Sequence, residues 1–200
     1  MKAIFIKDCL NIKAQGKSIL LVLLVWFVLS YFNGSGLFFS SLSVMYAMML
    51  PITSMSIDEK SHFERYAMTM PVTRTSMALS KYVFGVFCSL ILAVLGLAAS
   101  LIIGDEPAEA LLSCAACFCV GLVFMSVLLP LIYKLGVEKA RLSMMAIFVV
   151  FLIIFAFALE RMGVELDNIT DALMVLPLVT LAVMAVSMCI SVGIYRRKEF

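Results

Sequence analysis

The sequence has 200 residues, of which 64% are hydrophobic and 14% charged, and its formal net charge is +2. Its mean hydropathy of +1.13 lies far above that of water-soluble domains, which excludes a soluble globular protein and predicts an all-α, polytopic membrane protein. The polar stretches are too short to fold alone, so we expect a single transmembrane domain over residues 1–200.

Residues 1–17 predict an interfacial amphipathic helix that lies along the inner membrane surface. Four lysines recur in this segment, and its apolar side chains gather toward one side of a helix: Phe5, Ile6, Cys9, Leu10 and Ile12. A cleaved signal peptide is the alternative, because an apolar run over residues 19–29 follows the basic start. No Ala-x-Ala-like cleavage site comes after that run, which favours the surface helix.

Residues 19–57 must cross the membrane twice, because the basic segments on either side of them belong on the cytoplasmic side. The turn chemistry in this interval is Asn33-Gly34-Ser35-Gly36, which predicts a tight outer hairpin between spans over residues 19–32 and 37–57. The first span is short, since about 20 helical residues are needed to cross the hydrocarbon layer, and the Lys17 side chain can extend to the surface beside it.

The long polar segment, residues 58–82, predicts a helix, a proline corner and a second helix. The first helix carries four residues at helical spacing on one side: Phe63, Tyr66, Ala67 and Met70. Pro71 disfavours helical geometry at the residue before it and so ends this amphipathic helix, after which Thr73 or Thr75 can cap the second helix. An ordinary solvated loop is the alternative that amphipathicity alone leaves open.

Four further spans are predicted, over residues 82–103, 110–133, 142–159 and 172–195. Acidic residues follow the third and fifth spans, and basic residues follow the fourth and sixth. On this map every Lys and Arg except Arg161 lies on one side of the membrane. The positive-inside rule therefore predicts six transmembrane helices with the N- and C-termini both cytoplasmic.

The spans contain almost no ionisable residues, which disfavours an ion-coupled carrier, because such carriers use buried charged or histidine side chains. Ion coordination by hydroxyl groups in the spans, such as those of Ser40 and Ser54, stays open. Gly16-Lys17-Ser18 matches the end of a phosphate-binding loop, but Asn11 stands where that motif needs a glycine, and no strand precedes it. The energy for any transport is therefore expected to come from elsewhere.

Small side chains in the spans predict helix packing rather than a metal site. Cys114, Cys117 and Cys119 have no nearby His or acidic residue to complete a metal site, and the single histidine, His62, is expected on a solvated surface. Two sets of small residues recur at every fourth position and let helices approach closely, within one chain or between two copies: Gly96, Ser100 and Gly104, and Ser113, Cys117 and Gly121.

Four pieces of the polar loop stand out: Asp58-Glu59-Lys60, Phe63-Glu64, Met70-Pro71-Val72-Thr73-Arg74 and Leu79-Ser80-Lys81-Tyr82. With six spans and a basic surface helix, this pattern resembles the short bacterial permeases of the ABC type-2 exporter family. The resemblance implies a membrane subunit, not itself an enzyme, that works as a homo- or heterodimer with a second permease copy. It further implies separate ATP-binding-cassette ATPase subunits as partners, and export of a substrate across the bacterial inner membrane.

In that family the loop between the second and third helices docks on the ATPase as an amphipathic coupling helix. The resemblance assigns this partner-binding role to Glu59, Phe63, Glu64, Arg65, Tyr66, Pro71 and Arg74. We expect no catalytic residue, metal, cofactor or nucleic-acid partner; the remaining partner is the lipid bilayer.

The alternative function is a membrane scaffold or immunity-type protein, with a cytoplasmic protein-binding loop and no transport of its own. A neighbouring gene for a nucleotide-binding subunit would favour the exporter, and its absence would favour the scaffold. An intramembrane enzyme is disfavoured, since the sequence places no nucleophile and base together at membrane depth.

Overall fold

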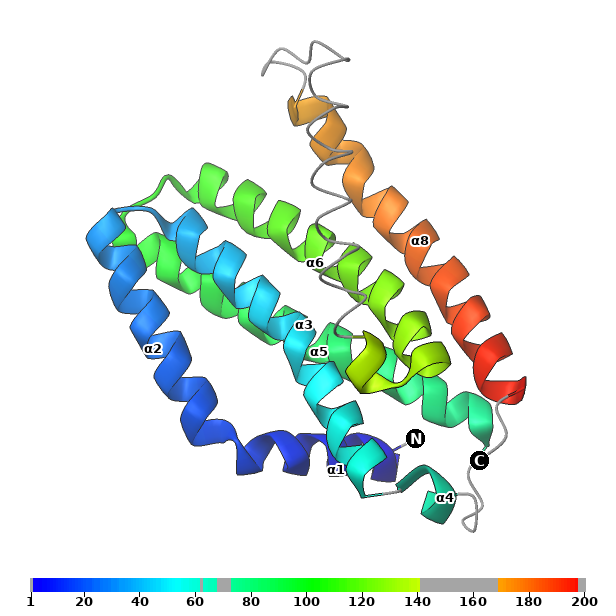
Figure 1. The fold of residues 1–200 in the computed structure, drawn as a ribbon. Coiled ribbons are helices and arrows are strands. Elements are labelled where there is room, and N and C mark those ends of the chain that lie inside the picture. The colour runs from blue at the N-terminus through cyan, green and yellow to red at the C-terminus, as the bar shows by residue number, and fades with distance from the viewer. Residues whose placement is uncertain (1, 62, 68–72, 141–168, 198–200) are drawn as a thin grey trace.

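The structure is a computed structural model that describes residues 2–61, 63–67, 73–140 and 169–197. The regular elements in these residues are all helices (Figure 1). In chain order they are α1 (Lys2–Ala14), α2 (Gly16–Asn33), α3 (Gly36–Lys60), α4 (Phe63–Ala67), α5 (Arg74–Ile103), α6 (Pro107–Leu135) and α8 (Ile169–Arg197).

Five of these helices are long and apolar enough to cross a membrane: α2, α3, α5, α6 and α8. They correspond in position to five of the six predicted spans, and the predicted span over residues 142–159 lies outside the described residues. Helix α5 begins at Arg74, well before residue 82, so the helix extends beyond the predicted span at its amino-terminal end.

The turn between α2 and α3 is the tight hairpin that its sequence predicts. Gly34 adopts a left-handed conformation with φ of 65°, which a residue without a Cβ atom adopts at little cost. Its N–H donates to the Tyr31 carbonyl at 3.2 Å, and the Ser35 N–H donates to the Ser30 carbonyl at 3.4 Å. These bonds satisfy carbonyl groups at the end of α2, where the helix offers no further donor.

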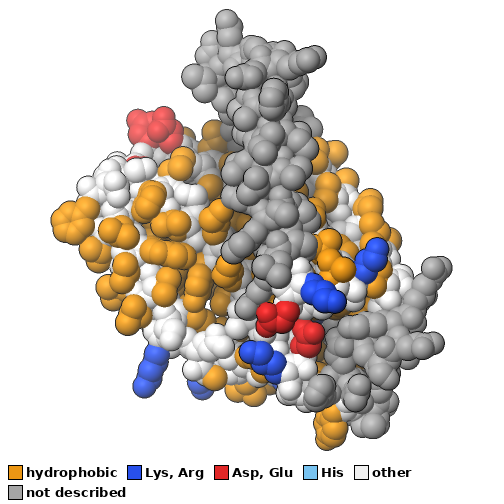
Figure 2. All heavy atoms as spheres, viewed as in Figure 1, with side chains coloured by type: hydrophobic (Ala, Val, Ile, Leu, Met, Phe, Trp, Pro, Cys, Tyr) orange, Lys and Arg blue, Asp and Glu red, His pale blue; other side chains and the backbone are white. Residues whose placement is uncertain are grey.

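The long helices pack as a bundle, and α1 lies across one end of it (Figure 1). Helix α3 packs closely on α5, and α6 packs on both of them and on α8, whereas α2 stands at the edge against α3. Figure 2 shows hydrophobic side chains over much of the visible face; the Lys and Arg side chains lie toward one end, where acidic side chains lie among them, and a further acidic group lies at the other end.

Helix α1 divides its apolar residues between two directions. Phe5, Cys9 and Ile12 pack against a buried cluster formed by α3 and α5, whereas Ile6 and Leu10 are 57% and 58% exposed. The sequence predicts one apolar side for this helix, but the structure divides these residues between two surfaces. One surface packs on the bundle, and the other, with Ile6 and Leu10, is exposed.

Helices α6 and α8 run side by side in the same direction (Figure 1). The Ser187 hydroxyl donates to the Ser126 carbonyl. About two turns further along the two helices, the rings of Tyr133 and Tyr195 lie 5.3 Å apart in an edge contact. Tyr82 joins α5 to α8, because its hydroxyl bonds to Ser187 at 2.6 Å and to Ser191 at 2.7 Å.

Two of the predicted small-residue positions serve packing within the chain. Gly96 faces Ser40 of α3, and a Cβ atom on Gly121 would lie 2.5 Å from Val44 Cγ1. A third close approach involves Gly36, where a Cβ atom would lie 2.5 Å from the Cα atom of Ser100. These positions let α3 approach α5 and α6 closely, as expected for helices that associate in lipid.

We predict that Gly36→Ala separates the start of α3 from the end of α5, because the obstructing atom belongs to the backbone and cannot rotate away. The expected cost is about 1–3 kcal/mol, the usual range for overpacking. Thermal denaturation of the purified protein in detergent measures it. Gly193→Ala is the matched control, since a Cβ atom there meets nothing within 4 Å and an alanine favours the helix. Equal transition temperatures for the two variants would contradict the prediction.

Candidate functional site

Helix α4 and the start of α5, the described parts of the predicted helix–corner–helix segment, lie at the end of the bundle where α1 lies. Helix α4 comprises five residues, Phe63–Ala67, and Met70 and Pro71 lie outside the described residues. The sequence offers Thr73 or Thr75 as the cap of the second helix, and the structure has Thr73. Its side-chain oxygen accepts a bond from the Ser76 N–H at 3.3 Å at the start of α5.

Four charged side chains from three helices meet beside this corner, and we call them the charge cluster: Lys7 and Asp8 of α1, Asp58 of α3 and Lys81 of α5. Lys81 Nζ lies 2.8 Å from Asp8 Oδ1 and 2.6 Å from Asp58 Oδ2. Lys7 Nζ lies 2.6 Å from Asp58 Oδ1 and 3.4 Å from Asp8 Oδ1. The Lys81 ammonium group therefore joins all three helices at one point.

Ser54 completes the polar contacts of the cluster. Its hydroxyl donates to Asp8 Oδ1 at 2.8 Å and accepts from Lys81 Nζ at 3.1 Å. Ser54 and Asp58 stand four residues apart on α3, so both side chains project from one face of that helix. With Ser54, the three donors of the Lys81 ammonium are satisfied.

The cluster is buried and electrically balanced. Asp8 is 0% exposed, and Asp58 and Lys81 are each 7% exposed. Removing a charged group from water is costly unless an opposite charge and hydrogen bonds compensate, and two ammonium groups here balance two carboxylates. Among the described residues, Asp8 Oδ2 is a buried oxygen without a hydrogen-bond partner, so the contacts of this carboxylate concentrate on Oδ1.

The Cys9 thiol beside Asp8 does not disturb this balance. Burial raises the pKa of Cys9, and the negative charge of Asp8 raises the pKa further. The thiol therefore stays protonated and uncharged near neutral pH. No group of three His, Cys, Asp or Glu side chains suited to a metal ion occurs in the described part of the chain.

Phe63 connects the charge cluster to α4. Lys7 Nζ lies 3.7 Å from the centroid of the Phe63 ring, the geometry of a cation–π contact. Phe63 is half-buried against the hydrophobic core, Ala67 is buried, and Tyr66 is 62% exposed. Helix α4 thus turns Phe63 and Ala67 toward the bundle and Tyr66 outward, rather than placing all three on one buried side.

Glu59 connects α3 to the segment after α6. Its Oε2 accepts a bond from the Val137 N–H at 2.9 Å, at the start of the helical residues 137–140. A carboxylate is favourable there, because the first N–H groups of a helix lack internal partners. Glu59 remains exposed, so this contact leaves part of its carboxylate at the surface.

The structure brings Glu59 and Phe63 together around the charge cluster. Glu64 and Arg65 lie in α4, and Arg74 is the first residue of α5. Asp8 was not among the predicted site residues, and Asp58 and Lys81 were assigned to a polar loop. The signal that could have found them is the lone acidic residue within the lysine-rich first helix, which needs a cation from elsewhere if that helix is buried on one side.

A cavity of about 50 Å³ borders the cluster and is lined partly by Lys7, Asp58, Phe63 and Lys81. Pockets for small-molecule ligands have volumes of roughly 300–1,000 Å³. The cavity is therefore too small for a substrate, and the site is better suited to holding helices together than to binding a ligand.

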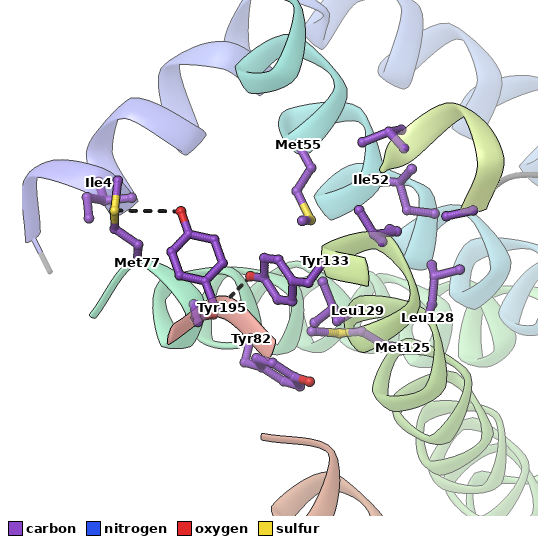
Figure 3. Packing of buried hydrophobic residues seen from close by; sticks show 14 of the residues in the cluster. Ile4, Ile52, Met55, Met77, Tyr82, Met125, Leu128, Leu129, Tyr133 and Tyr195 are labelled. Atoms are coloured by element: carbon purple, nitrogen blue, oxygen red, sulfur yellow. Dashed lines mark hydrogen bonds between the residues drawn. The ribbon is translucent and has the colours of Figure 1, made fainter. Parts of the chain in front are cut away.

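The core behind the cavity ties α5 to α6 and α8 (Figure 3). The Tyr195 hydroxyl is directed at Met77 Sδ, 3.8 Å away, and the Tyr133 hydroxyl donates to the Ala78 carbonyl at 3.2 Å. Met77 and Ala78 lie in the turn of α5 that precedes Lys81. The same end of α5 therefore contacts α1 and α3 through charges, and α6 and α8 through tyrosines.

We predict that Lys81→Met destabilises the protein by about 3–5 kcal/mol, because Asp8 and Asp58 would then face only one cation in a buried site. A lower transition temperature in thermal denaturation would record the loss. Lys13→Met is the matched control on α1, where the lysine is exposed and a change within about 0.5 kcal/mol is expected. A variant as stable as the control would show that the cluster contributes little to folding.

Comparison with protein-family models gives a match over residues 3–196 to a family described as ABC-2 family transporter protein. The match agrees with the resemblance carried by the loop sequence and extends over both the charge cluster and α4. Comparison with curated proteins and with solved structures gave no match.

Proposed function

Because the chain belongs to the ABC-2 family of transporter proteins, we propose that it is the membrane-spanning permease subunit of an ATP-driven exporter. The observation that carries this proposal is the family match over almost the whole chain. In this proposal a separate nucleotide-binding subunit hydrolyses ATP, and the permease moves a substrate across the bacterial inner membrane. Gly16-Lys17-Ser18 lies at the start of α2 and directly follows helix α1, which is not the strand-to-helix setting of a phosphate-binding loop.

Helix α4 is the proposed docking element for the ATPase. It lies at the same end of the bundle as α1 and the carboxyl end of α8 (Figure 1), which is the end we propose to be cytoplasmic. Tyr66 is exposed, as an aromatic anchor for a partner must be before it binds. Glu64 and Arg65 add charges of both signs to this short helix, and Pro71 and Arg74 belong to the proposed docking segment.

The parallel course of α6 and α8 supports six spans with both termini in the cytoplasm. Residues 137–140 lie at the α1 end of the bundle, because Glu59 bonds to Val137 there. Helix α8 also ends there, since Tyr195 contacts Tyr133, and its 29 residues are long enough to span the bilayer. The end of α6 and the start of α8 therefore lie at opposite ends of the bundle, which supports the proposed further span over residues 142–159.

A second permease copy, the same or a related chain, is the proposed partner within the membrane. Helix α2 packs mainly against α3 and leaves Leu20, Leu21 and Leu24 more than half exposed. Such a surface can face either lipid or another permease. We propose that a dimer of permeases carries the transport pathway between its copies.

Copurification with candidate ATP-binding subunits from the same genome tests the proposed function. The tag is placed on the permease, and ATP hydrolysis is measured on the purified complex in lipid. A stable, ATP-hydrolysing complex is the expected result. A folded permease that captures none of these subunits would overturn the exporter and favour a membrane scaffold.

We predict that the double variant Glu64→Ala/Arg65→Ala weakens ATPase association, because both charges lie on the proposed docking helix. The expected loss is about tenfold or more in affinity, the scale of removing one or two hot-spot residues. Pull-down at graded ATPase concentrations measures it, and Lys13→Ala on α1 is the matched control. Unchanged binding by the double variant would remove these two residues from the interface.

We predict cytoplasmic termini from reporter fusions. Green fluorescent protein, fused after Phe200, is expected to fluoresce in bacteria, and alkaline phosphatase at that position is expected to be inactive. The matched fusion after Glu106, an exposed residue between α5 and α6, should give the reverse pattern. The same pattern at both sites would contradict an even number of spans with both ends inside.

A further inference from the structure

We propose that Asp8, Asp58 and Lys81 are positioning residues for transport: they lock α1, α3 and α5 into one moving unit, so that motion of α4 reaches the outer end of the permease. This inference rests on the proposed function and adds to it the residues that transmit the motion. It goes beyond docking, because none of these three residues lies on α4.

We call the contact of α1, α3 and α5 at Asp8, Asp58 and Lys81 the joint. The hydrogen bonds of Lys81 make this joint stiff. One ammonium group contacts a carboxylate on α1, a carboxylate on α3 and a hydroxyl on α3, all within 3.1 Å. The three charged side chains are almost completely buried. Ion pairs of this kind resist separation, since pulling them apart would leave single charges in a poorly solvated place.

The input to the joint is Phe63. Its ring lies under Lys7 Nζ at 3.7 Å, and Lys7 in turn contacts Asp58 at 2.6 Å. A displacement of α4 therefore acts on α1 through Lys7, besides acting on α3 and α5 through the chain itself. The route from α4 to the cluster consists of direct contacts between described side chains.

The output of the joint is α5 and its neighbours. Tyr82 follows Lys81 directly and is 1% exposed, and its hydroxyl bonds to Ser187 and Ser191 of α8. Helix α5 then continues for its whole length along α3 and α6 to the turn that contains Asp105, whose carboxylate accepts a bond from the Gly36 N–H at 2.9 Å. Motion of the inner end of α5 is thus passed to α8 and to the outer turns.

Neutral double variants separate this role from a role in folding alone. Asp58→Asn/Lys81→Met removes one charge of each sign, so the remaining Lys7 and Asp8 still balance each other. Asp8→Asn/Lys81→Met likewise leaves Lys7 and Asp58 balanced. Both double variants therefore avoid an unpaired buried charge, yet both remove the ionic link between α5 and the other two helices.

The test uses the permease–ATPase complex in lipid nanodiscs. An environment-sensitive fluorophore is attached at position 106, in the exposed turn between α5 and α6, through an unnatural amino acid that leaves the six native cysteines in place. Its signal is recorded without nucleotide and with a non-hydrolysable ATP analogue. ATP hydrolysis and copurification are measured on the same preparations, with Lys13→Met as the matched control.

The expected result is that wild type and Lys13→Met respond to the analogue, whereas each neutral double variant binds the ATPase and hydrolyses ATP but loses most of the response. A wild-type response from either double variant would overturn the proposal and leave the cluster with a role in folding only. Absence of a response in a wild-type complex that binds the ATPase and hydrolyses ATP would overturn this proposal alone, whereas a folded wild-type permease that binds no ATPase would overturn the proposed function.

Discussion

The electroneutrality of one buried cluster constrains the whole end of the bundle at which α1 lies. Asp8 is completely buried and Asp58 nearly so, and Lys81 Nζ contacts both carboxylates, at 2.8 Å and 2.6 Å. The three residues belong to three helices, so their pairing fixes how α1, α3 and α5 sit relative to one another. The hydrophobic contacts around the cluster could slide by small amounts, but the three short bonds of the Lys81 ammonium group allow little displacement.

Helix α5 is the element on which these contacts converge. Its first turns contact α1 and α3 through charge, α6 through Tyr133, and α8 through Tyr82 and Tyr195. Its later turns pack closely on α3 where Gly96 and Gly36 leave room. The helix therefore joins the segment at which an ATPase is proposed to dock to nearly every described part of the bundle.

The features predictable from the sequence are those set by local chemistry. Apolar runs of sufficient length predict the described spans, Gly34 predicts the hairpin, and Thr73 predicts the start of α5. The site was only half predictable. Phe63 and Glu59 were named for a partner, yet the structure also gives each a partner within the chain, Lys7 and Val137.

The lone acidic residue of α1 indicates that Asp8 needs a cation, but which residues pair in the charge cluster could not be predicted, because its members come from distant segments. Asp8 and Lys81 each look like an ordinary charged residue of a surface helix when read within a short window. Hydropathy reports how apolar a segment is, but not which of its few charges find partners in space. The division of the apolar side of α1 was missed for a related reason, since periodicity cannot say whether lipid or protein covers each part of a surface.

The separation of Asp8 and Lys81 also governs how the protein is made. The two residues stand 73 positions apart, and the ribosome synthesises roughly 5–20 residues per second, so Lys81 is synthesised several seconds after Asp8. During that interval α1 lacks both α5 and the cation that α5 supplies to Asp8, so we expect α1 to stay at the aqueous boundary while α2 and α3 enter the bilayer. Completion of α5 then allows α1 to dock, so the first helix to be synthesised is among the last of these to reach its final place.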